Sequence, residues 1–203
     1  SARHQRGPNQ RKNMFSTQTT IRSLSLIAIG LITAVAAHAQ PAIPDEYKTG
    51  GFAIGCQAYS FNRFSAFEAI EKTAEAGGKI IEFYPGQKLS KEEPTLKVDH
   101  NASDEVIKKV QAKLAQHKIK AVNYGVVPIP EDEAAARKLF EFARKMGLRA
   151  LTTESTKSID TIEKLVKEYD IAVAYHNHPK KEKDPNYKVW DPHYIAELVK
   201  GRD

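Results

Sequence analysis

The strict alternation of short apolar runs with amphipathic segments constrains the fold of this chain more than any other feature. Each of five apolar runs suits a buried strand, and each is followed by a segment with apolar residues at helical spacing. Alternation of this kind implies parallel strands joined by right-handed helical crossovers. Strands are expected at residues 52–59, 79–84, 119–124, 148–153 and 171–175, and helices at 66–76, from 103 or 104 through 114, and at 131–146, 159–169 and 191–200.

Polar residues mark several of the expected helix ends. Ser65 stands three residues before Glu68, which is the spacing of a capping box, and Ser158 stands at the start of another helix. Gly147 follows a helical segment and is expected to end it. Residues 87–102 show no clear periodicity and are expected to form a polar loop.

Two architectures accept such an alternation, the (β/α)8 TIM barrel and the doubly wound sheet. A doubly wound sheet that binds dinucleotides usually has a glycine-rich turn after its first strand. The segment 57–63, which follows the first strand here, contains no glycine. We therefore predict an α/β fold of the TIM-barrel type, and a doubly wound sheet without a nucleotide site stays open.

Only five β/α units fit into the 203 residues, whereas a complete barrel usually needs about 250 residues. The last residues, 200–203, stand where a sixth strand would begin. We expect an incomplete barrel that is the N-terminal part of a longer product. The alternative is a true short product with an open sheet edge, which would need a partner. In either case we expect these residues to be inactive alone.

The N-terminal residues resemble a targeting segment. A run of small and apolar residues at 24–37 leads into an A-x-A cleavage pattern that ends at Ala39, and Met14 is a plausible start. We expect residues 1–39 to be upstream residues plus a signal peptide cleaved after Ala39, followed by a linker at 40–51 and a partial barrel at 52–203. The protein would then be exported, to the periplasm or beyond. The run is too short for a stable membrane span.

The basic charge of the chain belongs to this leader. The first 39 residues contain five Lys or Arg and no Asp or Glu, so the remainder has 26 basic against 25 acidic residues. A nearly neutral body lacks the positive surface that binds phosphate backbones, which argues against a nucleic-acid partner. Cys56 is the only cysteine, so it forms no internal disulfide, and we predict that it lies in a strand.

The carboxyl ends of the expected strands carry the candidate site residues, because ligands bind at this end of parallel α/β folds. The side chains found there are amides, phenols, imidazoles and carboxylates, which hydrogen-bond sugar hydroxyls. The candidate substrate-binding residues are Gln57, Tyr59, Glu82, Tyr124, His176, Asn177 and His178.

Glu154 is the candidate metal ligand. It follows an otherwise apolar strand, so its charge must be solvated, paired or bound to a metal. A carboxylate beside imidazoles suits a divalent ion such as Mn²⁺, Co²⁺, Mg²⁺ or Zn²⁺. For Glu82, a salt bridge inside the barrel is an equally good interpretation.

The strand ends also resemble those of a known superfamily. The segments are Cys-Gln-Ala-Tyr-Ser-Phe at 56–61, Ile-Glu-Phe at 81–83, Thr-Thr-Glu at 152–154 and Tyr-His-Asn-His at 175–178. They are similar to successive strand ends of the xylose isomerase-like barrels, a superfamily that includes the sugar phosphate isomerases/epimerases. The resemblance covers about residues 52–203.

This resemblance implies a (β/α)8 barrel with one divalent metal held by Glu, Asp, His and Glu from successive later strands. Glu154 matches the first ligand, and the others are expected beyond Asp203. His176 and His178 are then expected near the metal as substrate-facing groups. The implied chemistry is proton transfer or hydride shift beside a carbonyl. The endonuclease branch of the superfamily is disfavoured by the neutral body.

The function expected from these features is metal-dependent isomerisation or epimerisation of a carbohydrate. Export favours an unphosphorylated substrate, because sugar phosphates are cytoplasmic metabolites. The alternatives left open are a keto-sugar lyase or dehydratase of the same fold and a non-catalytic carbohydrate-binding barrel. No catalytic base is assigned, and a homo-oligomeric assembly stays open.

Overall fold

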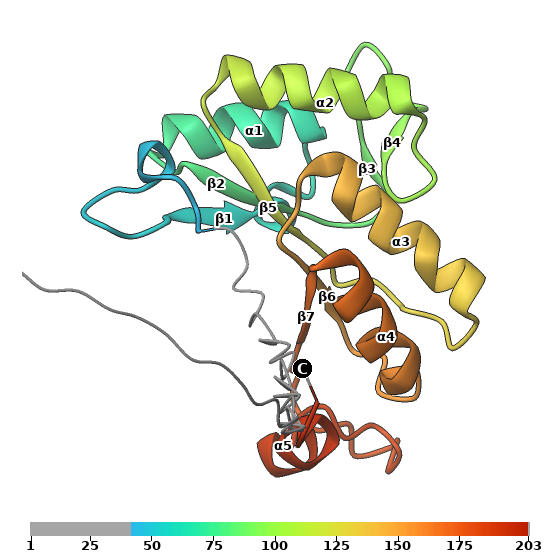
Figure 1. Cartoon of the computed structure of the whole chain (residues 1–203). Helices are drawn as coiled ribbons and strands as arrows, with labels where there is room; N and C mark the ends of the chain where they lie inside the picture. The colour runs from blue at the N-terminus through green and yellow to red at the C-terminus, as the bar shows by residue number, and fades with distance from the viewer. Residues whose placement is uncertain (1–41, 203) are drawn as a thin grey trace, which may run out of the picture. The chain divides into compact units, whose positions relative to one another are not determined.

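The computed structural model describes residues 42–202, and their central feature is a five-stranded parallel sheet. Its strands are β1 (Gly55–Gln57), β2 (Ile80–Phe83), β5 (Lys120–Tyr124), β6 (Ala150–Thr153) and β7 (Ala172–Tyr175) (Figure 1). All five expected strands are present, each shorter than its apolar run, and Cys56 lies in β1. The expected leader and its cleavage point after Ala39 lie outside the described residues.

The strand order distinguishes the two candidate architectures. The order is β1-β2-β5-β6-β7, so each strand pairs with the strand of the neighbouring β/α unit. A doubly wound sheet would reverse its order at a switch point, whereas a barrel adds its strands in sequence. The described sheet is therefore singly wound, as the strands of a TIM barrel are.

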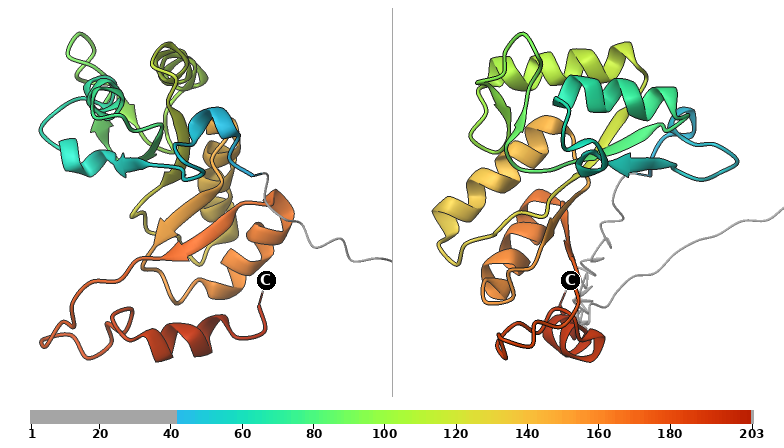
Figure 2. Two further views of the ribbon diagram at one scale, coloured as in Figure 1. Left: turned by 90° about the vertical axis from the view of Figure 1, so that its left-hand side faces the viewer. Right: turned by 180° about the vertical axis from the view of Figure 1, so that it is seen from behind.

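Five α-helices accompany the sheet, as expected. They are α1 (Ala66–Glu75), α2 (Asp104–Gln116), α3 (Glu133–Met146), α4 (Ile159–Tyr169) and α5 (Pro192–Val199). Figures 1 and 2 show α1 to α4 on one face of the sheet. The face that these helices leave uncovered is the face that would line the inside of a closed barrel.

The helix starts confirm one capping prediction and correct another. Ser65 and Glu68 form the expected capping box of α1. Ser158 is the N-cap residue of α4, but its side chain makes no capping hydrogen bond. Its hydroxyl instead donates to the carbonyl oxygen of Ile129 at 2.7 Å, because the residue is buried against the β5–α3 loop.

The core lies between the sheet and its four covering helices. Ile81, Phe83, Leu151 and Phe140 are completely buried there. At about 25 cal/mol per Å² of apolar surface, each such side chain stabilises the fold by roughly 1.5–3 kcal/mol. Alternate residues of each strand point into this layer, so the residues between them face the uncovered side.

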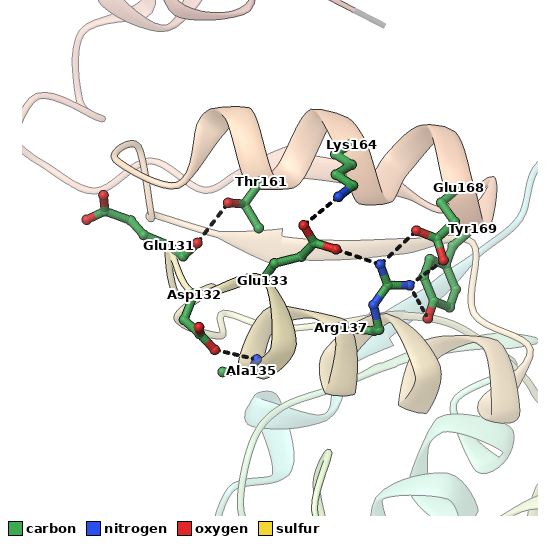
Figure 3. Close-up of polar contacts among 9 residues, drawn as sticks. All are labelled: Glu131, Asp132, Glu133, Ala135, Arg137, Thr161, Lys164, Glu168 and Tyr169. Atoms are coloured by element: carbon green, nitrogen blue, oxygen red, sulfur yellow. Dashed lines mark hydrogen bonds and ion pairs between the residues drawn. The ribbon is translucent and has the colours of Figure 1, made fainter.

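An ion-pair network joins α3 to α4 (Figure 3). Arg137 of α3 pairs with Glu168 of α4 and with Glu133 one turn earlier, and it also donates to the Tyr169 hydroxyl at 3.2 Å. Lys164 of α4 reaches back to Glu133 at 2.6 Å. The network therefore links neighbouring β/α units on their solvent side.

Two segments are more structured than the sequence suggests. The expected loop at 87–102 contains a short antiparallel pair, β3 (Gln87–Lys88) with β4 (Lys97–Val98). The sequence did not predict this pair, because strands of two residues are too short to show a periodic pattern. The described part of the expected linker contains a 3-10 helix, η1 (Asp45–Tyr47), and an isolated bridge between Thr49 and Phe52. A second 3-10 helix, η2 (Ala58–Phe61), follows β1. Within residues 42–202, no helix has the length and apolar character needed to cross a membrane.

Candidate functional site

Polar side chains from four neighbouring strands meet on the uncovered face of the sheet. Glu82 lies between Ile81 and Phe83, which are buried under the helices, so its own side chain faces the other way. The amide of Gln57 donates to Glu82 Oε1 at 3.2 Å. On the next two strands, Asn123 Nδ2 donates to Thr152 Oγ1 at 2.6 Å. These residues form what we call the amide–carboxylate network: Gln57, Glu82, Asn123 and Thr152.

A register shift in the sheet brings Asn123 into this network. Ile81 of β2 pairs with Ala121 of β5, but Glu82 pairs with Asn123, so β5 has one extra residue, Val122, at this point. Paired residues of parallel strands point to the same face, so without the bulge an apolar side chain would stand opposite Glu82. Because of the bulge, the amide of Asn123 and not the side chain of Val122 lies beside the Glu82 carboxylate.

Gly125 lets the backbone come close to the same network. A Cβ added at Gly125 would lie 2.4 Å from the carbonyl oxygen of Thr152, a distance that no side chain tolerates. At this point the Gly125 carbonyl oxygen accepts a second hydrogen bond from Gln57 Nε2, at 3.1 Å. Both hydrogen bonds together orient the Gln57 amide toward Glu82.

Burial raises the pKa of Glu82 above its usual range. Hydrogen bonds from Gln57, Thr152 and Asn123 and the nearby imidazole of His176 act in the opposite direction but do not offset the burial. Among the described residues Glu82 forms no ion pair, so the salt-bridge interpretation is not supported. Glu82 is a carboxyl group that burial biases toward its protonated form.

Glu154, His176 and His178 form a second cluster at the same edge. Glu154 directly follows β6, and the two histidines follow β7, whose pairing with β6 brings these strand ends together. Each of the three residues offers a donor atom, and all three atoms lie within 4.8 Å of one another. Glu154 Oε1 is hydrogen-bonded to His178 Nδ1, and the two imidazole rings pack edge to face at 4.6 Å between centroids.

This donor set fits a divalent metal ion, because carboxylate oxygens and imidazole nitrogens are common ligands of such ions in proteins. The sequence predicted Glu154 as the ligand and the histidines only as neighbours of the metal. In the structure all three donor atoms lie close enough to share one ion.

The structure does not bring every predicted residue to this edge. Tyr124 is completely buried and packs edge to face on Phe142 of α3 at 4.9 Å, so it belongs to the core on the opposite face from Asn123. Tyr59 is largely exposed in η2 and stacks edge to face on Tyr84 at 5.2 Å. Asn177 is exposed, between the two histidines in the segment after β7.

Two residues of the site were missing from the predicted set. Thr152 belongs to the amide–carboxylate network, whereas its neighbour Thr153 is completely buried on the helix side of the sheet. In the sequence, only the alternation of side chains along β6 could have indicated which of the two threonines faces the site. Tyr187 lies in the Lys-rich segment after β7 and approaches Glu154 and His178. Burial and the negative charge of Glu154 raise the pKa of its phenol.

Comparison with known proteins finds a solved structure of similar fold but assigns no function. No protein-family model and no curated protein matches the chain. A crystal structure of an uncharacterised protein from Parabacteroides distasonis ATCC 8503 matches 75% of this chain with a TM-score of 0.62 and 26% identity. The chain spans 60% of the length of that structure.

Two solved structures of sugar enzymes are similar at a lower level. A sugar phosphate isomerase/epimerase from Parabacteroides distasonis ATCC 8503 has a TM-score of 0.44 and 14% identity, over 77% of this chain and 64% of that one. A D-psicose 3-epimerase, solved in the presence of D-fructose, has a TM-score of 0.40 and 13% identity, over 59% and 51%. At this distance neither likeness bears on the activity of this chain.

Proposed function

We propose that this chain supplies the first five β/α units of a metal-dependent sugar isomerase or epimerase with a TIM-barrel fold. The observation that carries the proposal is the Glu154–His176–His178 donor cluster at the carboxyl ends of β6 and β7. It lies at the same edge of the sheet as the amide–carboxylate network, so a ligand for the one is within reach of the other. The resemblance of the strand ends to xylose isomerase-like barrels supports the same reaction class.

The metal, when bound, would polarise a carbonyl or hydroxyl oxygen of the sugar and so acidify the neighbouring C–H. Glu154, His176 and His178 are the residues of this chain that would hold it. We propose Mn²⁺, Co²⁺ or Zn²⁺ because two of the three donors are imidazole nitrogens.

The remaining site residues would bind and orient the sugar. Gln57 and Asn123 offer amide groups that both donate and accept hydrogen bonds, as vicinal hydroxyls require. In its carboxylate form Glu82 accepts hydrogen bonds from sugar hydroxyls. In its protonated form it can also donate one hydrogen bond. The amide of Gln57 is held by Gly125, so its orientation is set before the sugar arrives.

We propose that the protein works outside the cytoplasm on an unphosphorylated carbohydrate. The support is the apolar run at 24–37 with its A-x-A pattern, which is typical of an export signal. The near-neutral charge of residues 40–203 agrees with an uncharged substrate.

Glu154→Gln tests the metal site. The substitution keeps the size of the side chain but removes its charge, so we expect the purified variant to retain much less Mn²⁺ or Zn²⁺ than the wild type. Elemental analysis after dialysis measures the bound metal. Glu75→Gln is the matched control, because Glu75 is exposed at the end of α1. Equal metal content in both variants would refute the role of Glu154.

Product analysis tests the reaction class. An isomerase or epimerase yields a product of the same mass as its substrate, which mass spectrometry and sugar chromatography together identify. A product that has lost water or an aglycone would instead assign a lyase or dehydratase.

A further inference from the structure

The segment between β7 and α5 forms a pocket that the proposed metal centre and the amide–carboxylate network do not use. Figure 2 shows this segment leaving the tip of β7 and returning as α5. The pocket has a volume of about 340 Å³, at the small end of the usual range for ligand sites, about 300–1,000 Å³. It therefore has room for one sugar ring rather than for a large cofactor.

Three aromatic side chains line this pocket: Tyr187, Trp190 and Tyr194. Trp190 is the only tryptophan of the 203 residues, and 37% of its surface is exposed. Ligand pockets are commonly lined by hydrophobic and aromatic side chains with a few polar groups, as this pocket is. The C–H faces of a pyranose ring are apolar and flat, which makes them complementary to aromatic rings.

The charged residues of the pocket cancel one another. Lys180 and Lys188 stand against Asp184 and Asp191, so the lining has no net charge. A neutral lining does not attract phosphate or carboxylate ligands, but its ammonium and carboxylate groups do hydrogen-bond hydroxyls. Lys180 Nζ lies over the Trp190 ring, 5.7 Å from its centroid, and Lys188 Nζ lies over the Tyr194 ring at 5.6 Å. A stacked sugar would displace these ammonium groups from the ring faces, and the groups would then bind its hydroxyls. The chemistry therefore favours a neutral polyol.

Tyr187 connects this pocket to the proposed metal centre. Its ring lines the pocket, whereas its hydroxyl is buried near Glu154 and the backbone of His178 and has no hydrogen-bond partner among the described residues. The pocket and the donor cluster thus share one side chain. A ligand that extends from one to the other would be longer than one sugar ring.

From this geometry we infer that the pocket lined by Tyr187, Trp190 and Tyr194 is a second sugar-ring subsite, and that the substrate is a neutral disaccharide or similar two-ring glycoside. This inference rests on the proposed function for the identity of the first ring. The stacking subsite itself needs only the aromatic pocket, so the two can be tested separately.

The emission of Trp190 tests the subsite directly, because no other tryptophan in the 203-residue chain contributes. We expect cellobiose or maltose to shift or quench this emission with half-saturation at least about tenfold below that of glucose, since the second ring adds contacts. Tyr194→Ala should weaken the disaccharide response about threefold to tenfold, which is the usual size of an aromatic contact. Tyr194→Phe keeps the ring and should preserve the response.

Tyr47→Ala is the matched control, because Tyr47 packs near Lys120 at the opposite end of the sheet. The inference is overturned if neither disaccharide changes the emission, if glucose acts at the same concentration, or if Tyr194→Ala and Tyr47→Ala behave alike. A Glu154→Gln variant that loses metal but keeps the emission change supports the subsite. Retained metal with no emission change would refute the subsite and leave the proposed function standing.

Discussion

Thr153 offers the sharpest test of how the fold supports the site. Its side chain is completely buried at the end of β6, next to Glu154. Its hydroxyl donates to the Val127 carbonyl oxygen at 2.7 Å and accepts from the Ser155 amide at 3.1 Å. These two hydrogen bonds fasten the start of the β6–α4 loop to the β5–α3 loop.

Thr153→Val replaces the hydroxyl by a methyl group of nearly equal volume. The Val127 carbonyl oxygen would stay buried without its donor, which costs about 1–3 kcal/mol. The Ser155 amide is only half buried, so water can replace its partner at a cost below about 1 kcal/mol. We therefore expect Thr153→Val to destabilise the fold by roughly 1–4 kcal/mol.

Thr153→Ser is the matched variant, because it keeps the hydroxyl and removes one methyl group, at a cost of about 1 kcal/mol. Urea unfolding followed by circular dichroism measures both. With a slope of about 2 kcal/mol/M, the valine variant should unfold at roughly 0.5–2 M lower urea than the wild type. A hydrophobic argument alone predicts the reverse order, since valine is the more apolar residue. If the serine variant is the less stable of the two, the hydrogen-bond reasoning is refuted.

Two further predictions concern charged groups. Because burial raises the pKa of Glu82, its contribution to folding is fully present below pH 4.5, its ordinary value, and is lost as the pH rises through the higher folded-state pKa. The free energy of unfolding, measured by urea titration, should therefore fall less between pH 4.5 and neutrality in Glu82→Gln than in the wild type. The same pH dependence in both proteins would contradict the effect of burial on Glu82. Arg137→Met should lower the thermal midpoint by removing the α3–α4 ion pairs, and this difference should shrink in about 1 M salt because the pairs are partly exposed. A difference that is the same at low and high salt would assign the effect to packing of the side chain instead.

Periodicity alone was sufficient to predict the five strands and five α-helices, because the strands are short apolar runs and the helices have apolar residues at helical spacing. Of the five strands, β2, β5 and β6 have fully buried residues. Periodicity could not detect β3 and β4, since strands of two residues contain no period. The order of the strands in the sheet depends on which strands pair with one another, and the sequence of a single strand does not show its partner.

Most of the predicted site residues lie at one edge of the sheet, but the sequence did not show which face of the sheet each side chain points to. Tyr124 and Asn123 are adjacent at a strand end, and the sequence does not show which of them points into the helix layer. The bulge at Val122 decides this, and such an extra residue is visible only from the partner strand. The approach of Tyr187 to Glu154 depends on the path of the segment after β7, which has no periodic pattern.

The position of the donor cluster at β7 has a consequence for its own integrity. Within residues 42–202, β7 is hydrogen-bonded to β6 alone, so it is held on one side only. Local opening of this strand would carry His176 and His178 away from Glu154 while the other four strands stay paired. An ion bound by all three residues would join the two strand ends and oppose that opening. Binding of an ion at the donor cluster would thus stabilise the pairing of β7 with β6, and loss of that pairing would weaken ion binding.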